Sequence, residues 1–481
     1  MEPEQETLSG TAADSHLVVI GAGPAGLTAA YELGRNGKTV LVLEQEREIG
    51  GLSRTVEYRG FRFDIGGHRF FTKVDEVAQL WRSLLGDDLL TRPRKSRIFY
   101  GGRYFDYPLR LLNTLGNLGA GESLLIFFSY LRVKLFPLRP ESSLDEWVSN
   151  RFGKRLFKMF FQSYTEKVWG IPCRAISSQW AAQRIKGLSL RTALLNMLPF
   201  GFTGSGKGIR TLIDQFHYPR LGPGMMWDAL RLRIIAAGGS VKTGSSVRKL
   251  HHDGARIRSL ILEEGGEMIE MAVTEVISTM PLSSLLLGFS PPAPPDVINA
   301  AQRLRYRDFL TVALIIDKEE LFPDNWLYIH DETVKVGRIQ NFKNWSPELV
   351  PDPSQSCLGM EYFCNAGDCL WTMADKDLVT LAVRELAAIG LASQEMVLEG
   401  VVVRMPKAYP VYDEEFPGAV AVIRKYLDRF ANLRVVGRNG MHKYNNMDHS
   451  MLTGLLAARC ILGEEHDLWE TNTDEEYHES G

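Results

Sequence analysis

The sequence has few cysteines, and their spacing suggests no link between them. The five residues Cys173, Cys357, Cys364, Cys369 and Cys460 are odd in number and form no CxxC pair. This pattern supports neither a disulfide framework nor a structural zinc site. We therefore expect no bound metal and a reducing, cytoplasmic location.

An excess of positive charge and long apolar runs are also absent. Lys and Arg number 55 against 58 Asp and Glu, so we expect no nucleic-acid partner, which a positive field would favour. The most apolar stretch, 124–131 (LLIFFSYL), is far shorter than the roughly 20 residues that cross a bilayer. The N-terminus, MEPEQETLSGTAAD, is acidic and polar where a signal peptide is basic and then apolar. We expect no membrane span, and at 124–131 a helix that is buried or docked on a surface.

The order of segment types predicts an α/β protein of two to four domains for this length of 481 residues. Two apolar runs, 17–20 (LVVI) and 39–43 (TVLVL), flank an amphipathic stretch at 25–35, which is typical of a βαβ unit. Later segments alternate between helix-like and strand-like patterns. The predicted divisions are a discontinuous Rossmann-like nucleotide-binding domain at 15–102, 205–290 and 405–463, a helical substrate or cap domain at 103–204, an antiparallel-sheet substrate domain at 291–404, and flexible tails at 1–14 and 464–481.

A glycine-rich turn follows the first strand directly. Gly21 permits the tight turn, Gly23 lets backbone amides approach a pyrophosphate, and Gly26 lets the helix lie close to the strand. Glu44 ends the second strand, where an acid can take the ribose hydroxyls. A plain glycine-rich turn is the alternative, but the full strand–turn–helix–strand–acid order favours a dinucleotide site.

A second glycine pair, Gly50-Gly51-Leu52-Ser53-Arg54, places further amides and a cation near the same pyrophosphate. With the returning segments 218–227 and 277–281, the sequence resembles FAD-binding proteins of the amine oxidase and protoporphyrinogen oxidase type. The resemblance implies FAD as the tightly held cofactor. It assigns FAD contacts to Gly21, Gly23, Pro24, Ala25, Gly26, Glu44, Gln45, Gly51, Leu52, Ser53, Gly66, Gly67, His68, Val247, Met280, Gly437, Arg438, Asn446, Met447 and Ser450.

Five further clusters of polar and aromatic residues narrow the chemistry. They are 63–71 with its Gly66-Gly67-His68 loop, 164–172 followed by Arg184, 338–347, 409–412 and 437–450. Taken singly, each has an ordinary structural explanation such as a turn, a helix core or a solvated strand edge. Their order and spacing together resemble the UDP-galactopyranose mutase family.

That resemblance implies a flavin-dependent isomerase that interconverts the pyranose and furanose forms of a UDP-hexose through a covalent adduct with reduced FAD. NADPH or NADH as the reductant is left open. The resemblance assigns catalytic roles to His68, Arg184, Arg338 and Arg438. It assigns substrate binding to Tyr164, Trp169, Arg184, Arg338, Trp345, Tyr409, Tyr444 and Asn446.

Three departures from the family pattern leave the nucleotide and the hexose open. The stretch 103–108 (RYFDYP) is only loosely similar to the family's nucleotide-contacting segment. Trp345 stands where eukaryotic members carry a tyrosine, and Asn445-Asn446 replaces the Tyr-Asp pair of bacterial members. The main alternative is an FAD-dependent oxidoreductase of the amine oxidase or protoporphyrinogen oxidase type, since a fold alone does not fix function. A non-catalytic FAD-binding protein is a further alternative, and the sequence indicates no oligomeric interface.

Overall fold

The structure is a computed structural model that describes residues 16–472 except 108, 110, 177, 179–214 and 414. The chain divides into two compact units, each assembled from separate segments. The first comprises 1–51, 227–304 and 418–471, and the second comprises 52–226, 305–417 and 472–481. The finer division into three domains made from the sequence stays a prediction.

The first unit holds an eight-stranded sheet with helices packed on it. Its strands are β1 (His16–Ile20), β2 (Val40–Glu44), β9 (Ser240–Thr243), β10 (Ser245–His252), β11 (Ile257–Glu264), β12 (Glu267–Ser278), β13 (Phe289–Ser290) and β19 (Leu433–Val435). Its helices are α1 (Pro24–Arg35), α10 (Gly224–Ala236, mainly in this unit), α11 (Leu282–Leu287), α12 (Pro295–Arg303), α15 (Phe416–Leu427, mainly in this unit), α16 (Gly437–Gly440) and α17 (Met447–Ile461).

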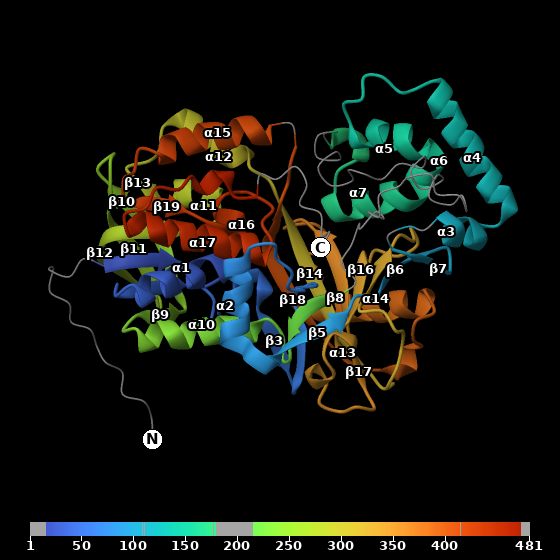
Figure 1. The fold of residues 1–481 in the computed structure, drawn as a ribbon, viewed down its shortest axis with the longest axis horizontal. Helices are drawn as coiled ribbons and strands as arrows, with labels where there is room; N and C mark the ends of the chain where they lie inside the picture. Colours follow the sequence, from blue (N-terminus) through green and yellow to red (C-terminus); the bar gives the residue numbers. More distant parts are fainter. Residues whose placement is uncertain are drawn as a thin grey trace, which may run out of the picture. The chain divides into compact units, whose positions relative to one another are not determined.

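The centre of this sheet is parallel, as the two apolar runs predict. The sheet order is β13-β10-β11-β12-β1-β2-β9, and β19 pairs with β12. β1 pairs in parallel with β2 on one side and with β12 on the other. Because both faces of parallel strands are covered, β2 is buried along its whole length. Helices α1 and α17, from opposite ends of the sequence, lie side by side (Figure 1).

The second unit contains a seven-stranded sheet and two further sheets of two strands each. Its strands are β3 (Thr55–Tyr58), β4 (Phe61–Asp64), β5 (Leu89–Pro93), β6 (Ser96–Tyr100), β7 (Arg103–Asp106), β8 (Gln215–Pro219), β14 (Tyr306–Ile316), β15 (Trp326–Ile329), β16 (Arg338–Asn341), β17 (Ser356–Cys364) and β18 (Val397–Pro410). Its helices are α2 (Asp75–Leu85), α3 (Leu111–Leu118), α4 (Ala120–Leu135), α5 (Leu144–Phe152), α6 (Lys154–Phe157), α7 (Ser163–Trp169), α13 (Phe342–Trp345) and α14 (Asp375–Ala388).

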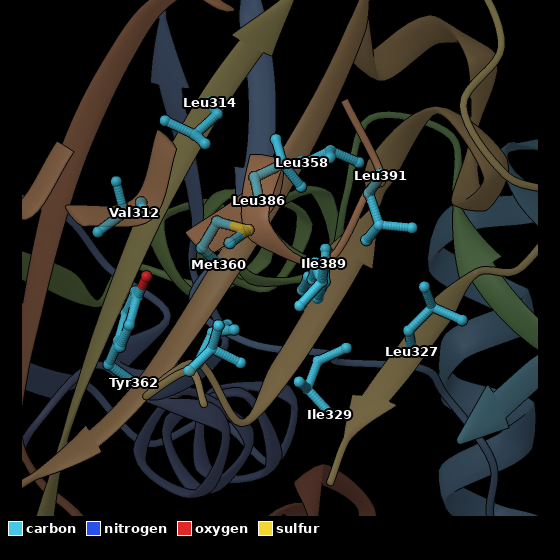
Figure 2. Close-up of a cluster of buried hydrophobic side chains, with 14 of the residues drawn as sticks. Val312, Leu314, Leu327, Ile329, Leu358, Met360, Tyr362, Leu386, Ile389 and Leu391 are labelled. Atoms are coloured by element: carbon cyan, nitrogen blue, oxygen red, sulfur yellow. The ribbon is translucent and has the colours of Figure 1, made fainter. Parts of the chain in front are cut away.

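The strands of the large sheet run in the order β18-β14-β17-β16-β15-β6-β7. Neighbours are antiparallel except β15 and β6. Side chains alternate between the two faces of β14, so Val312 and Leu314 face one core while Ala313 and Ile315 face another. Figure 2 shows the first of these cores, in which Met360 and Leu386 lie among the aliphatic side chains. The predicted fold class, a mixed α/β protein with a parallel and an antiparallel sheet, is confirmed.

Helices α4, α5, α6 and α7 form a group within the second unit (Figure 1). Ser143 caps α5 by accepting a hydrogen bond from the backbone of Glu146, whose side chain bonds back to Ser143, a capping box. Among the helices that the structure describes, none is long and apolar enough to cross a membrane.

Candidate functional site

The glycine turn of the first unit has the geometry that the sequence predicts. Gly21 adopts φ +99°, where a side chain is strained, and a Cβ there would lie 1.9 Å from Thr279 Oγ1. A Cβ at Gly26 would lie 1.9 Å from the backbone oxygen of Gly21. The turn therefore brings strand β1 and helix α1 together as closely as glycine allows. No side chain caps α1, which begins at Pro24, so its N-terminal amides face the turn, an arrangement that favours a bound phosphate.

Glu44 orients this turn from the end of β2. Its carboxylate is buried and accepts hydrogen bonds from the backbone N–H of Ala22 at 2.7 Å and of Glu46 at 3.0 Å. The carboxylate is thus held beside the glycines, at the place predicted for a ribose contact. Gly50 donates to the Ala22 oxygen at 2.8 Å, which brings the second glycine pair to the same turn.

The closing segment of the chain reaches the same helix. Gly437, with φ +80°, lies where a Cβ would be 3.0 Å from the Cβ of Ala25. The guanidinium carbon of Arg438 lies 4.8 Å from the centre of the Tyr444 ring. The Nε–H of Arg438 donates to the Asn445 oxygen at 2.9 Å. These contacts fix the direction of Arg438 before α17 begins.

The remaining first-unit residues predicted for FAD are spread over several elements. Gln45 is exposed after β2, Val247 is buried in β10, and Met280 follows β12 with its N–H on Ser278 Oγ at 3.2 Å. Asn446 directly precedes α17, whose first residues include Met447 and Ser450. Leu52 and Ser53 open the second unit.

In the second unit, the glycine pair before His68 lies against β14 and β16. A Cβ at Gly66, which has φ +93°, would lie 3.8 Å from an Arg338 guanidinium nitrogen. A Cβ at Gly67 would lie 2.9 Å from Gln340 Nε2. Glycine at both positions therefore lets the His68 turn approach the strand that carries Arg338.

Arg338 is held by a buried acid. It forms an ion pair with Glu361 across the β16–β17 register, and Gln340 Nε2 donates to the same carboxylate at 2.8 Å. Glu361 is 0% exposed. Burial lowers the pKa of Arg338, but the Glu361 carboxylate together with the neighbouring tyrosines outweighs burial and holds the pKa well above its ordinary value. The guanidinium is therefore a fixed positive charge on a rigid strand.

Two arginines that the sequence did not single out as site residues lie beside it. The guanidinium carbons of Arg69 and Arg94 each lie 5.4 Å from the centre of the Trp326 ring, in the range of a cation–π contact. Burial lowers the pKa of Arg69 to about 10, and the positive charges of Arg94 and Arg338 contribute to the lowering. Within the described part of the chain, the buried Nε of Arg94 has no hydrogen-bond partner. Like charges held this close to one another favour a bound anion.

Tyrosines surround these cations. The rings of Tyr107 and Tyr328 are 4.7 Å apart between centres, and Tyr164 meets Tyr328 edge-on at 5.5 Å. Tyr164 also stacks on His330 at 4.8 Å and 6°. Burial, with a contribution from Lys167, lowers the pKa of His330 to about 3. We call this set the arginine–tyrosine cluster: Arg69, Arg94, Tyr107, Tyr164, Tyr328 and Arg338.

Two other predicted substrate residues, Tyr409 and Trp169, also lie in the second unit. Tyr409 packs against Phe309 and Phe363 and contributes to raising the pKa of Arg338. Trp169 ends α7 and lines a small pocket with Tyr412.

Trp345 is 1% exposed, and its indole N–H donates to the Asn325 oxygen at 2.9 Å, which places it in an aromatic core. Arg184 lies outside the described residues. The roles predicted for all these residues stay predictions.

Comparisons with known proteins agree on a flavoprotein. The chain is 28% identical over 307 residues to all-trans-retinol 13,14-reductase of Rattus norvegicus, covering 54% of this chain and 46% of the relative. It is 36% identical over 114 residues to putrescine oxidase of Kocuria rosea, covering 21% of this chain and 23% of the relative. The chain thus spans less than half the length of the curated relatives that it matches.

A solved structure of reduced UDP-galactopyranose mutase has a TM-score of 0.81 to this protein, at 21% identity, covering 96% of this chain and 98% of the other. At that identity the likeness shows a shared fold. The mutase resemblance is therefore matched at the level of fold, while the sequence relatives favour the oxidoreductase alternative.

The family comparison extends over nearly the whole sequence. The flavin containing amine oxidoreductase family matches residues 24–462, which include helix α1, the arginine–tyrosine cluster and helix α17. The flavin part of the cofactor prediction is confirmed at this level, and the uncapped α1 with the oriented Glu44 fits such a dinucleotide. Because the match takes in segments of both units, this chain belongs to the flavin containing amine oxidoreductase family.

Proposed function

We propose that this protein is an FAD-dependent enzyme whose substrate carries a phosphate or diphosphate, and that it interconverts the pyranose and furanose forms of a nucleotide sugar. One observation carries the proposal: three arginines gather with three tyrosines in the second unit, and the Arg94 Nε is a buried donor with no partner among the described residues. Buried cations are stabilised by an anion that replaces lost water. A nucleoside diphosphate supplies both that charge and flat rings for the tyrosines.

In this proposal the arginines of the second unit bind the diphosphate of the substrate. Arg338, fixed by Glu361, is placed to hold the diphosphate during and after bond cleavage, because its direction is set by two strands. Arg69 and Arg94, whose guanidinium groups lie over the Trp326 ring, add positive charge for binding the diphosphate. Arg184, outside the described residues, keeps its proposed role as a further diphosphate ligand.

The first unit would hold the cofactor through the Gly21–Gly26 turn, Glu44 and the start of α17. Reduced FAD, when bound, supplies the electron pair that a redox-neutral rearrangement of the sugar needs. Arg438 is placed by Tyr444 and the backbone oxygen of Asn445, and we propose that it orients the flavin ring. His68, in the second unit, keeps the role predicted from the sequence. NADPH or NADH as the reductant and a cytoplasmic location are part of the same proposal.

A second candidate is FAD-dependent oxidation or reduction. The family match and the names of the curated relatives favour it over the mutase. A protonated amine, however, is repelled by the clustered arginines, and an apolar substrate leaves the buried Arg94 Nε without a partner among the described residues, so the cluster argues for an anionic substrate in either case.

The test compares the two chemistries on the full-length yellow protein. UDP-galactopyranose is supplied to protein reduced by dithionite without oxygen, and the furanose product is measured by chromatography. We expect conversion only in the reduced state. Peroxide release by the oxidised, aerated protein with an amine or other donor, together with no furanose product, contradicts the mutase and supports the second candidate.

A further inference from the structure

Helix α4 of the second unit exposes an unusually large apolar surface. We call it the α4 face, and its side chains are between 42% and 74% exposed. They are Leu124, Leu125, Phe127, Phe128, Leu131, Leu135 and Phe136. Contiguous apolar surface of this kind marks an interaction site.

The helix itself is firmly attached to the unit. Its opposite side buries Ile126 and Val133 at 2% and 7% exposure, and Ile126 belongs to the core that α5 and α6 share. Glu122 in its first turn binds Arg155, with one contact at 2.9 Å. The exposed leucines and phenylalanines therefore lie on a helix whose opposite side is already packed in the hydrophobic core of the unit.

The surroundings of the α4 face are positively charged. No Asp or Glu occurs between residues 123 and 140, a stretch that carries three basic side chains, and α6 and the turn after it add three more, Lys154, Arg155 and Lys158. The nearby acids Glu122 and Glu141 bind Arg155 and Arg151. Among the residues that the structure describes, five cations keep no carboxylate partner: Arg132, Lys134, Arg139, Lys154 and Lys158.

We propose that the α4 face docks the protein onto the surface of an anionic lipid bilayer. Exposed Phe and Leu flanked by Lys and Arg are the pattern of a helix that lies in the membrane interface. With 16 residues, α4 is about 24 Å long, shorter than the roughly 30 Å hydrocarbon core, so it lies along the surface rather than across it. Lipid phosphates complement the five cations, whereas a second copy of this chain would bring like charges together.

This proposal is independent of the function proposed above. Vesicles of phosphatidylcholine alone and of phosphatidylcholine with an equal amount of phosphatidylglycerol are mixed with the full-length protein and sedimented. We expect binding to the phosphatidylglycerol vesicles that falls as salt rises from about 0.05 to about 0.5 M. Equal binding to both vesicles, or none to either, overturns the proposal.

Two variants separate the apolar and electrostatic contributions. Phe127→Ser with Phe128→Ser removes apolar area and lowers vesicle binding at least about tenfold. Arg132→Gln with Lys134→Gln keeps the apolar side chains and lowers binding to phosphatidylglycerol vesicles roughly 30-fold, since each basic residue near an anionic surface contributes about 1 kcal/mol.

A matched control carries the same kind of change elsewhere. Leu232 and Ile235 of α10 are 63% and 52% exposed in the first unit, and their double change to Ser leaves vesicle binding unaltered. Light scattering and thermal unfolding are measured for every variant. Undiminished vesicle binding by the phenylalanine variant overturns the proposal, as does a dimer that this variant converts to monomer, because a second copy would then cover the face.

Discussion

Replacing Arg338 by Ala tests the central electrostatic argument. The change removes the partner of Glu361, whose side chain is 0% exposed and, among the described residues, is left with the Gln340 hydrogen bond. Leaving one charge of a buried pair alone costs about 3–5 kcal/mol of unfolding free energy. If Arg338 also binds the diphosphate, the variant loses a charge-assisted contact of about 1.5–3 kcal/mol, which is roughly 10- to 150-fold in the Kd for UDP.

The same sheet offers a matched control. Arg97 binds the fully buried Asp324 through two nitrogens, with the shortest contact at 2.6 Å, yet neither residue belongs to the arginine–tyrosine cluster. Arg97→Ala is expected to lower stability to a similar degree and to leave the Kd for UDP unchanged. Denaturant unfolding and calorimetric titration with UDP measure the two effects separately.

The outcome of this comparison is decisive for the binding role. A UDP affinity that falls in Arg338→Ala but not in Arg97→Ala supports direct contact with the diphosphate. Equal UDP affinities in the two variants and the unchanged protein would refute the reasoning, because the ion pair would then serve stability alone.

Three further outcomes follow from the geometry. The pKa of His330 is lowered to about 3 from an ordinary 6.5, so the unfolded chain binds the proton first and stability is lost as pH falls below 6.5. The loss is about 2 kcal/mol between pH 7 and pH 5 in urea unfolding, and His330→Phe should flatten this slope. Gly454→Ala places a Cβ 2.2 Å from a backbone oxygen of α1 and should cost about 1–3 kcal/mol or more, whereas Gly418→Ala, which meets nothing within 4 Å, should be neutral or stabilising in a thermal melt. Glu44→Ala removes the acceptor of two turn amides and should lower the flavin retained after gel filtration, which the exposed Glu46→Ala should not; equal flavin content in both contradicts the role of the carboxylate.

Local patterns predicted much of the fold. The apolar runs at 17–20 and 39–43 correspond to β1 and β2. These elements are buried on both faces, so their sequences are continuously apolar and need no knowledge of distant partners. The glycine turn was also predictable from the sequence. The contacts that require glycine at position 26 lie within the same βαβ unit, whereas the contact of Gly21 with Thr279 comes from a distant segment.

The arginine–tyrosine cluster could not be predicted in the same way. Arg69, Arg94 and Arg338 come from three separate segments, and the sheet order β16-β15-β6 brings their strands and loops together. No local spacing encodes that order. The position of Arg69 directly after Gly67-His68 was the available signal, because a cation beside a predicted ligand loop is a candidate anion contact. Trp345 was predicted from the sequence to contact substrate. In the structure it packs in an aromatic core against Phe216 and Trp326, which are distant in sequence.

The pairing of α1 with α17 has a consequence for how the chain is made. The two helices end at Arg35 and Ile461. Because ribosomes add roughly 5–20 residues per second, about 20 to 85 seconds pass between the synthesis of α1 and that of α17. During synthesis the apolar side of α1 stays uncovered while the segments of the second unit emerge and fold. Completion of the helical layer on the eight-stranded sheet is therefore among the last events of biogenesis, and a nascent chain halted before α17 offers chaperones an unfinished layer.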